Sequence, residues 1–268
     1  MIAWFHHKKK SQASLLRKDD FVAISSHELR SPLSIIKWYT EILLDEDAGS
    51  LNEEQKKYLR VIETSNQRAI DLIRSLLNVS RLDLDTFGIS PQEFILTDFV
   101  TSAISSVNEL ASKKQIEIIE EKNGDIPLMM LDKHVCALVL RQPLTNAIAF
   151  SLSESKILIT TFFAKKGSDV GGYLIPDDSI IVSVKDTGLG IPVDDQSHIF
   201  GRMYRGSNAE DSPGSDSGLG LYIAKTVMNL PEVDGDIWFE SEIGKVTTFY
   251  IAFPTKGMRK KEGRTVLE

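Results

Sequence analysis

The stretch Asp186-Thr187-Gly188-Leu189-Gly190-Ile191 follows an apolar run, Ile180–Val184, that is typical of a buried β-strand. Its glycines permit a tight turn and a close approach of the backbone to a ligand. A carboxylate at the end of a strand can accept a hydrogen bond from an exocyclic amine, such as that of adenine. Taken alone, a plain turn is the simpler interpretation. Aspartic proteases also carry Asp-Thr-Gly, but they need two such carboxylates, and the sequence has no second copy.

Strands and helices alternate on both sides of this stretch, which predicts an α/β sandwich. The predicted strands lie near Phe94–Leu96, Ile116–Ile119, Leu128–Leu131, Ile157–Phe163, Ile180–Val184, Asp236–Glu240 and Thr247–Phe253. The predicted helices cover Asp98–Lys113, a segment capped by Asp132 that runs to about Ser151, and Leu219–Leu230. A Gly-rich loop joins Ile157–Phe163 to the next strand. The polar tail after Pro254 is predicted to be mobile.

The first part of the chain is predicted to be a helical hairpin. Apolar or small residues recur at steps of three or four, so each helix carries one apolar face. These positions are Val22, Ser25, Leu29, Leu33, Ile36, Thr40 and Leu43, then Tyr58, Ile62, Ser65, Ala69, Leu72, Leu76 and Val79. Asp45–Asn52 forms the turn, and Asn52 begins the second helix. One hairpin cannot bury both faces. Two copies can pair as a four-helix bundle, or the hairpin packs on the rest of its own chain.

The domain boundaries follow from these patterns. Residues 1–14 form an N-terminal segment, 15–83 the helical hairpin, 84–92 a linker, 93–255 the sandwich and 256–268 a polar tail. The segment Met1–Phe5 is apolar and aromatic and leads into His6–Lys10. It is either the cytoplasmic end of a membrane span or a basic terminus without fixed structure. No run in the sequence is long enough to cross a bilayer.

Composition excludes several classes of function. The 268 residues are 42% hydrophobic and 26% charged, as in an ordinary soluble globular protein. The net charge of −7 argues against general nucleic-acid binding. The single cysteine, Cys136, excludes an internal disulfide framework, fits a reducing compartment and is predicted to be a buried thiol.

His27 lies in Ser26-His27-Glu28-Leu29-Arg30-Ser31-Pro32. Leu29 follows His27 by two positions, about 200° around a helix axis, so His27 is expected to point away from the apolar face. A neutral imidazole has one nitrogen free to attack phosphorus, while a carboxylate such as Glu28 can hold the other. Without further context, an ordinary surface histidine is the simpler interpretation.

Two further stretches have the chemistry of a phosphate site. Gly214-Ser215-Asp216-Ser217-Gly218-Leu219-Gly220-Leu221 opens a predicted helix, where backbone amides can meet phosphate. Asn146, in Leu144–Ile148, offers an amide oxygen suited to Mg²⁺ beside phosphate oxygens. Each signal is weak alone, because flexible loops are often rich in glycine and helix surfaces often carry asparagine.

The order of these signals resembles the sensor histidine kinases of two-component systems over about residues 15–254. Ser26–Leu33 resembles the H-box and Asn146-Ala147 the N-box of that family. Asp186–Ile191 is similar to its first glycine box, and Ile199–Arg205 to its F-box. Gly218–Leu221 is similar to its second glycine box. Ser241–Gly244 and Thr247–Phe249 are similar to the family's last strand pair.

This resemblance implies a fold, an activity and a site. The fold is α+β: a dimeric four-helix bundle followed by an ATP-binding sandwich of the gyrase type. His27 would be the phosphoacceptor, with Glu28 as its base or orienting partner and Ser31 as a residue for phosphatase activity. Asn146 would bind Mg²⁺, Asp186 the adenine amine, with Thr247 in support. The segment from about Phe200 to Gly218 would be a mobile lid. The implied nucleotide contacts are Asn146, Asp186, Gly188, Gly190, Ile191, Phe200, Tyr204, Arg205, Gly218, Leu219, Gly220, Leu221 and Thr247.

The resemblance also implies cofactors, partners and a location. ATP and Mg²⁺ are expected, with a homodimer, a response-regulator receiver domain as partner and no nucleic acid. The expected location is cytoplasmic, with any membrane attachment through an N-terminal span. The ATP domain must reach His27, so a hinge is expected near residues 84–92.

Departures from the family leave alternatives open. Gln142 stands where Asn is usual, and Pro143 removes a backbone donor inside a helix. Ala149 and Val246 replace a common polar residue and a common glycine, and Asp216 adds a negative charge to the lid. The expected activity is autophosphorylation of His27 from Mg-ATP and transfer to an aspartate. One alternative is a degenerate scaffold that dimerises and docks a response regulator without ATP turnover. Another is a gyrase- or chaperone-type ATPase without phosphotransfer.

Overall fold

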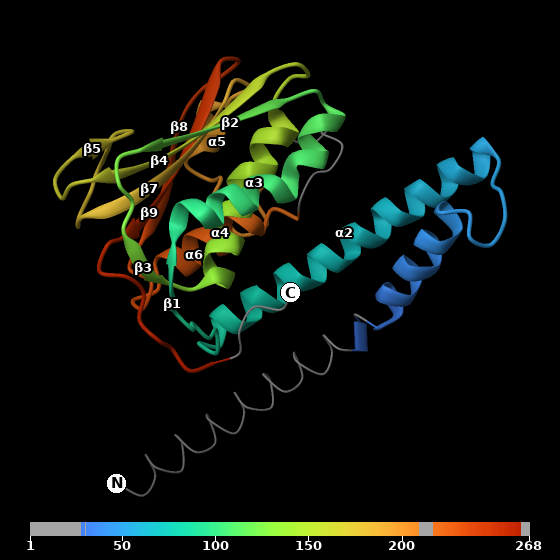
Figure 1. Cartoon of the computed structure of the whole chain (residues 1–268), viewed down its shortest axis with the longest axis horizontal. Coiled ribbons are helices and arrows are strands. Elements are labelled where there is room, and N and C mark those ends of the chain that lie inside the picture. Colours follow the sequence, from blue (N-terminus) through green and yellow to red (C-terminus); the bar gives the residue numbers. More distant parts are fainter. Residues whose placement is uncertain (1–27, 30, 209–216, 264–268) are drawn as a thin grey trace, which may run out of the picture. The chain divides into compact units, whose positions relative to one another are not determined.

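The computed structural model describes residues 28–29, 31–208 and 217–263 (Figure 1). The chain forms two compact units, and the boundary between them in the sequence falls at Thr86 and Phe87. The first unit is helical and the second mixes strands with helices. The predicted order of a helical hairpin followed by an α/β sandwich is therefore confirmed.

The first unit is a hairpin of two helices. Residues 31–44 are helical, residues 45–52 form the turn, and α2 covers Glu53–Asp83. Asn52 begins α2 with a reciprocal capping box. Its Oδ1 accepts from Gln55 N at 2.8 Å, and Gln55 Oε1 accepts from Asn52 N at 2.9 Å. The predicted turn and the predicted start of the second helix are both confirmed.

The apolar faces of the hairpin are only partly covered. Asn66 Nδ2 of α2 donates to Leu33 O at 2.9 Å, and Ile70 is buried, so the two helices contact each other. Many large apolar side chains nevertheless stay exposed, among them Leu29, Ile36, Leu43, Tyr58, Ile62, Leu72 and Leu76. All seven belong to the predicted stripes. An exposed apolar face of this extent calls for a partner.

The second unit is built on a five-stranded sheet of order β2-β4-β7-β9-β8. β2 and β4 are parallel, and the other neighbours are antiparallel. The strands are β2 (Glu117–Asn123), β4 (Lys156–Ala164), β7 (Ser179–Asp186), β9 (Val246–Pro254) and β8 (Asp236–Glu242). Since β7 lies in the middle and is buried almost throughout, its last residue, Asp186, is held on a rigid support. β1 (Gln92–Ile95) and β3 (Leu128–Leu131) form a separate antiparallel pair.

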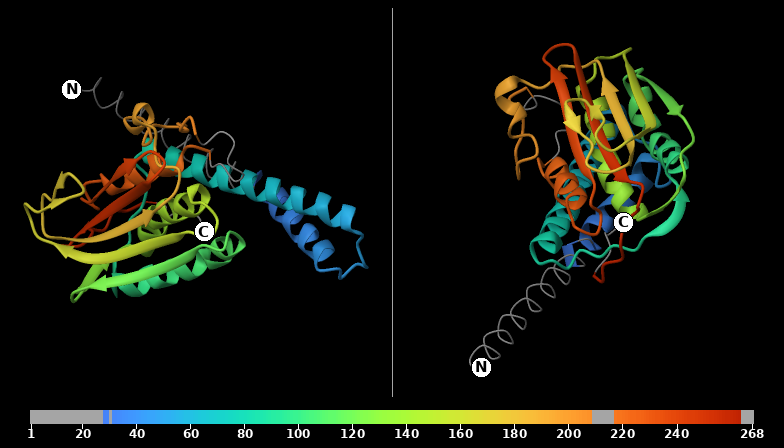
Figure 2. Two further views of the ribbon diagram at one scale, coloured as in Figure 1. Left: turned by 90° about the horizontal axis from the view of Figure 1, so that it is seen from above. Right: turned by 90° about the vertical axis from the view of Figure 1, so that its left-hand side faces the viewer.

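Three helices cover one face of this sheet (Figure 2). They are α3 (Leu96–Lys113), α4 (Lys133–Phe150) and α6 (Gly220–Met228). Asp132 caps α4 as predicted, because its Oδ1 accepts from His134 N at 2.7 Å and from Val135 N at 3.1 Å. α4 is continuous through Pro143, which is buried, so the proline does not divide the helix.

A small hairpin within the connection from β4 to β7 was not predicted. It consists of β5 (Asp169–Val170) and β6 (Tyr173–Leu174). The Trp238 ring of β8 stacks on Tyr173 at 4.5 Å and on Tyr250 at 5.4 Å between ring centroids, and Trp238 Nε1 donates to Val170 O at 2.9 Å. Trp238 forms a core cluster with Ala164, Ile175, Ile181 and Ala252. Ile181 alternates with Ile180 and Val182 along β7, so this cluster lies on the other face of the sheet.

The chain after Pro254 is packed, so the prediction of a mobile tail is wrong for residues 255–263. Met258 is buried and its N–H donates to Met130 O at 2.7 Å. Ile89 and Lys261 exchange two backbone hydrogen bonds of 3.0 Å. Ile89 comes from the segment predicted as a linker, where Phe87 is also buried. A hinge within residues 84–92 would therefore have to lie before Phe87.

Candidate functional site

Asp186 ends β7 with its side chain largely buried, at 4% exposure. Its Oδ1 accepts a hydrogen bond from Gly188 N at 3.0 Å. Burial raises the pKa of the Asp186 carboxyl to about 6, although the Gly188 bond acts in the opposite direction. A buried carboxylate of this kind gains from a ligand that donates hydrogen bonds to it.

Thr247 lies directly opposite Asp186 in the β7–β9 ladder. Residues paired in this way carry their side chains on the same face of the sheet. The Thr247 hydroxyl lies 2.8 Å from Ser241 Oγ of β8, and Ser241 Oγ accepts from Ile191 N at 2.9 Å. Ser241 thus connects Thr247 to the end of the first glycine stretch.

The glycine stretch after Asp186 is fixed by its backbone. Leu189 N donates to Phe150 O at 3.2 Å, and Leu189 O accepts from Gly244 N at 2.8 Å. Gly190 has a φ of +65°, a conformation that side chains rarely adopt. Any side chain at Gly188 would collide with the carbonyl of Phe150. The stretch is therefore an ordered loop that packs on the end of α4.

The second glycine stretch leads into α6. Leu219 is the N-cap residue of α6, and its apolar side chain cannot accept a hydrogen bond. The backbone N–H groups of the first turn, which begins with Gly220 and Leu221, therefore have no side-chain cap at this position. The predicted helix start at Leu219 agrees with the structure within one residue. Such an N-terminus favours an anion, and phosphate is the typical one.

α4 touches both glycine stretches along one face. The side-chain amide of Gln142 lies against Gly220, and the carbonyl of Phe150 lies against Gly188 and Leu189. Asn146 is half-buried, four residues from each, and so lies between them. Its amide has no side-chain hydrogen bond within the described part of the chain. The departures at Gln142 and Pro143 are thus accommodated by α4.

The predicted F-box begins after α5 (Val193–Gln196), a short helix that was not predicted. Phe200 packs on Phe239 with 6.0 Å between ring centroids, and Lys225 Nζ lies 5.3 Å from the Phe200 ring centroid. Tyr204 OH donates to Asp195 Oδ1 at 2.6 Å, while Arg205 is exposed. Residues 209–216 of the predicted lid, including Asp216, lie outside the described residues.

The phosphoacceptor predicted in the first unit, His27, lies outside the described residues. Glu28 and Ser31 are described and both side chains are exposed. Ser31 follows His27 by four positions, the spacing that places two residues on one face of a helix. Glu28 and Ser31 therefore have the accessibility that a reaction with a second protein requires.

Three residues of the site region were missed by sequence reasoning. Lys114 Nζ donates to Ile148 O at 2.9 Å and Ala149 O at 2.6 Å and so caps the C-terminus of α4. Ser241 and Asp195 connect loops that are distant in sequence. Ser241 carried one signal, because it begins the stretch that resembles the family's last strand pair.

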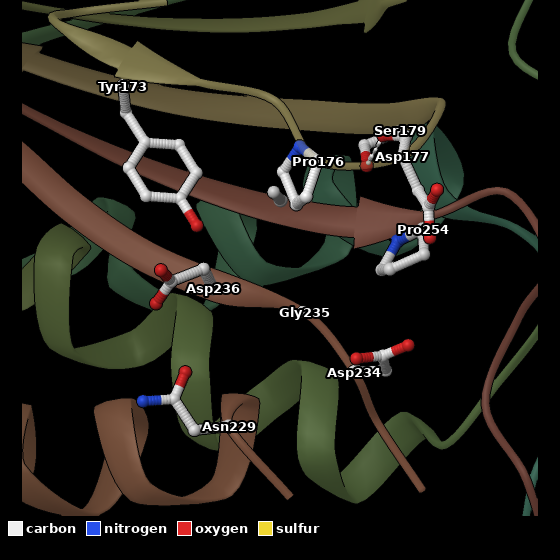
Figure 3. Close-up of a pocket in the computed structure, with 10 residues that line it drawn as sticks. Tyr173, Pro176, Asp177, Ser179, Asn229, Asp234, Gly235, Asp236 and Pro254 are labelled. Atoms are coloured by element: carbon white, nitrogen blue, oxygen red, sulfur yellow. Dashed lines mark hydrogen bonds between the residues drawn. The ribbon is translucent and has the colours of Figure 1, made fainter. Parts of the chain in front are cut away.

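A separate cavity of about 310 Å³ lies at the opposite end of the sheet (Figure 3). It opens at the first residues of β7 and β8, away from Asp186. Its carboxylates are paired with lysines: Asp236 with Lys225 at 2.5 Å, and Asp177 and Asp234 with Lys256 at 3.0 and 2.6 Å. Within the described ranges, no cluster of three or more His, Cys, Asp or Glu residues is arranged to hold a metal ion. This cavity does not share the chemistry of the Asp186 site.

The chain combines a helical hairpin with an α/β unit that follows it in the sequence and carries the Asp186 site, and a family model matches each of the two. Residues 17–85 match the His Kinase A (phospho-acceptor) domain. Residues 132–257 match the histidine kinase-, DNA gyrase B- and HSP90-like ATPase. The chain belongs to the sensor histidine kinase family.

Known relatives agree with this assignment. The chain is 26% identical over 246 residues to the circadian input-output histidine kinase CikA of Synechococcus elongatus, covering 91% of this chain and 31% of CikA. It is 29% identical over 237 residues to the sensor histidine kinase WalK of Bacillus subtilis, covering 88% of this chain and 36% of WalK. The chain therefore spans about a third of the length of these relatives.

Solved structures share the fold. Full-length ShkA in complex with AMPPNP has a TM-score of 0.67 at 21% identity, over 90% of this chain and 47% of that one. The histidine kinase AdeS of Acinetobacter baumannii has a TM-score of 0.56 at 17% identity, over 86% of this chain and 98% of that one. Across the described residues, no helix is both long enough and apolar enough to span a membrane.

Proposed function

We propose that this chain is the core of a sensor histidine kinase that phosphorylates His27 from ATP and passes the phosphoryl group to an aspartate of a response regulator. The observation that carries the proposal is the position of Asn146 on α4. Asn146 lies between two contacts of α4. At the end of α4, Phe150 contacts the loop that follows Asp186, and one turn before Asn146, Gln142 contacts the uncapped N-terminus of α6. This arrangement fits a ligand with a base at one end and phosphates at the other.

The residues present fit Mg-ATP. The Asp186 carboxylate would accept a hydrogen bond from the adenine amine, with Thr247 beside it in the ladder. The first turn of α6 would receive phosphate oxygens. The amide oxygen of Asn146 would be the protein ligand for Mg²⁺, since this ion prefers oxygen ligands. When bound, Mg²⁺ would neutralise charge on the phosphates.

The transfer itself needs an in-line nucleophile and little covalent chemistry from the protein. A nitrogen of the neutral His27 imidazole would form a bond to the γ-phosphorus while the bond from phosphorus to the ADP oxygen breaks. Glu28 would hold the N–H of the other ring nitrogen and stabilise the positive charge that develops on the ring. Glu28 would thus fix the tautomer of His27 and leave the attacking nitrogen free.

The second transfer would use the same histidine. The phosphoryl group would leave the His27 nitrogen for a carboxylate oxygen of a receiver domain, which restores the neutral imidazole. Ser31, which is exposed and follows His27 by four positions in the sequence, would position a water molecule that hydrolyses the phosphoaspartate of that partner. This role follows from its hydroxyl and its place on the helix.

The hairpin would pair with that of a second copy of the chain. The stripe from Tyr58 to Leu76 on α2, together with Leu29, Ile36 and Leu43, is apolar and exposed in a single copy. Four helices can bury these faces together. Charging one stripe residue, as in Ile62→Glu, is expected to convert the dimer to a monomer in sedimentation analysis. Thr64→Glu, on the other side of α2, is the matched control and should leave the dimer intact.

Incubation with γ-labelled Mg-ATP tests the kinase activity directly. The expected product is a label on the protein that is lost in acid and stable in base, and that is absent in His27→Gln. His134→Gln, in the second unit, should label normally. Nucleotide binding without any label, or free phosphate release that ignores His27, would instead indicate a gyrase-type ATPase. Absence of any nucleotide binding would indicate the degenerate scaffold.

A further inference from the structure

We propose that Asp195 is a positioning residue that holds the segment Tyr204–Asn208 between the two glycine stretches and thereby sets how tightly the phosphates of the nucleotide bind. The inference rests on the proposed function, because it assigns a role at the same ATP site. Asp195 itself would touch neither the nucleotide nor the reacting atoms.

The Asp195 carboxylate gathers three donors from one short segment. Its Oδ1 accepts from Tyr204 OH at 2.6 Å, and its Oδ2 accepts from Ser207 N at 2.7 Å and Ser207 Oγ at 2.8 Å. The side chain is only 7% exposed. The Tyr204 hydroxyl, followed by the N–H and hydroxyl of Ser207, lowers the pKa of Asp195, so the carboxylate is ionised at neutral pH. Hydrogen bonds to an ionised acceptor are the stronger kind.

On the adenine side, this segment reaches the first glycine stretch. Asn208 directly follows Ser207, and its Nδ2 donates to Gly190 O at 2.9 Å. The glycine stretch also has its own supports, because Leu189 N bonds Phe150 O and Ile191 N bonds Ser241 Oγ. It therefore keeps its shape without Asp195.

On the phosphate side, the same segment packs against the residue that introduces α6. Gly218 has a φ of +69°, and a Cβ there would lie 2.6 Å from Tyr204 O and 2.8 Å from the carbonyl carbon of Met203. The backbone at Met203 and Tyr204 thus fills the space beside Gly218. Asp195 holds the Tyr204 side chain through its hydroxyl. The carboxylate therefore fixes the backbone at Met203 and Tyr204, which packs against Gly218 just before the uncapped start of α6.

These contacts predict a selective effect. Loss of the Asp195 charge would weaken the hydrogen bonds from Tyr204 and Ser207. The segment that packs beside Gly218, at the start of α6, would then be less ordered, while the loop after Asp186 would stay in place. The part of the affinity that comes from phosphates should therefore fall, and the part that comes from the nucleoside should remain. A residue with a merely structural role would lower both parts together.

The test is a calorimetric titration of the full chain with Mg-ATP and, separately, with adenosine. Asp195→Asn is expected to raise the Kd for Mg-ATP by about tenfold, the effect of one lost hydrogen bond to a charged group, with the Kd for adenosine unchanged within about twofold. Asp194→Asn is the matched control. It removes the same charge from the neighbouring, exposed position of α5 and should change neither Kd.

A second variant keeps the test decisive if Asp195→Asn does not fold. The double variant Tyr204→Phe with Ser207→Ala retains the carboxylate and removes the two side-chain donors, and it should show the same selective loss of Mg-ATP affinity. Equal losses for Mg-ATP and adenosine, or a Kd as in Asp194→Asn, would overturn the role of Asp195. If the unmodified chain binds neither ligand, the proposed function fails and this inference fails with it.

Discussion

The side-chain amide of Gln142 on α4 lies directly against Gly220 in the first turn of α6. The two helices therefore approach closely at the point where α6 begins. A methyl group at Gly220 would overlap the Gln142 amide, because the amide oxygen and carbon are the atoms nearest to that methyl position. A side chain at Gly220 would therefore require the end of the Gln142 side chain to move.

This contact predicts coupling between the two positions. Gly220→Ala alone should gain little stability, because the overlap offsets the preference of helices for alanine, which is about 1 kcal/mol. In a Gln142→Ala background the overlap is gone, and the same change should stabilise the protein. A double-mutant cycle in chemical denaturation is expected to give a coupling of about 1 kcal/mol. Additive effects of the two changes would contradict the contact.

Asp186→Asn is expected to stabilise the chain and to abolish nucleotide binding. The amide removes a buried charge, so the free energy of unfolding at pH 7 should rise by about 1–3 kcal/mol. The change also replaces one of the two carboxylate oxygens with an NH2 group, which donates and so cannot accept from the adenine amine, while the remaining oxygen can keep the bond from Gly188 N. Thermal melts and calorimetric titration measure the two effects. A variant that is less stable and still binds would show that Asp186 is a structural residue.

The raised pKa of Asp186 also gives this variant a pH signature. The folded carboxyl has a pKa of about 6, above its ordinary value of 3.8, so the folded protein holds the proton more tightly. The contribution of the Asp186 carboxyl to the free energy of unfolding is complete below its ordinary pKa of 3.8, and it is lost as the pH rises through about 6. The stability advantage of Asp186→Asn over the unmodified chain should therefore grow between pH 4 and 7. A constant difference across this range would contradict the shift.

Lys114→Met is expected to lower the free energy of unfolding by about 1–3 kcal/mol, because the ammonium group no longer bonds the carbonyls at the end of α4. These carbonyls are Ile148 O and Ala149 O. Lys113→Met is the control, since Lys113 is exposed and pairs with Glu109 on the surface of α3. Its effect should stay below about 0.5 kcal/mol. Equal effects of the two changes in urea denaturation would remove the capping role.

Asn52→Ala should destabilise the hairpin by about 1 kcal/mol, because it removes one half of the capping box at the start of α2. Ser50→Ala, two residues earlier in the exposed turn, provides the comparison and should be neutral. The helical signal in a melt of the chain is the measurement. If Asn52→Ala melts like Ser50→Ala, the cap contributes nothing.

Local patterns in the sequence were sufficient for the main elements. Period and cap signals placed α4 between Asp132 and Ser151 and ended β7 at the Asp186 stretch, in agreement with the structure. The order of the glycine stretches was equally informative. Each of these features depends on residues that are neighbours along the chain, and such signals are readable without tertiary contacts.

The missed features depend on contacts between distant segments. The β5–β6 hairpin has only two residues in each strand and is held by Trp238, which lies 68 positions from its partner Val170. Lys114 looks like any surface lysine until the end of α4 is placed beside it. Met258 is apolar in a polar tail, and its contact with Met130, like that of Lys261 with Ile89, appears only when distant segments are brought together. The periodicity of apolar residues along the sequence does not reveal contacts between such distant segments.

The stacking of Trp238 between two tyrosines has a spectroscopic consequence. The chain has three tryptophans, at positions 4, 38 and 238. Trp38, in the first unit, is 58% exposed, whereas Trp238, in the second, is 8% exposed. In a Trp4→Phe background, the solvated indole would emit at longer wavelength and the enclosed one at shorter wavelength. A shift of the Trp238 emission to longer wavelength would then report the melting of the second unit, without any added label.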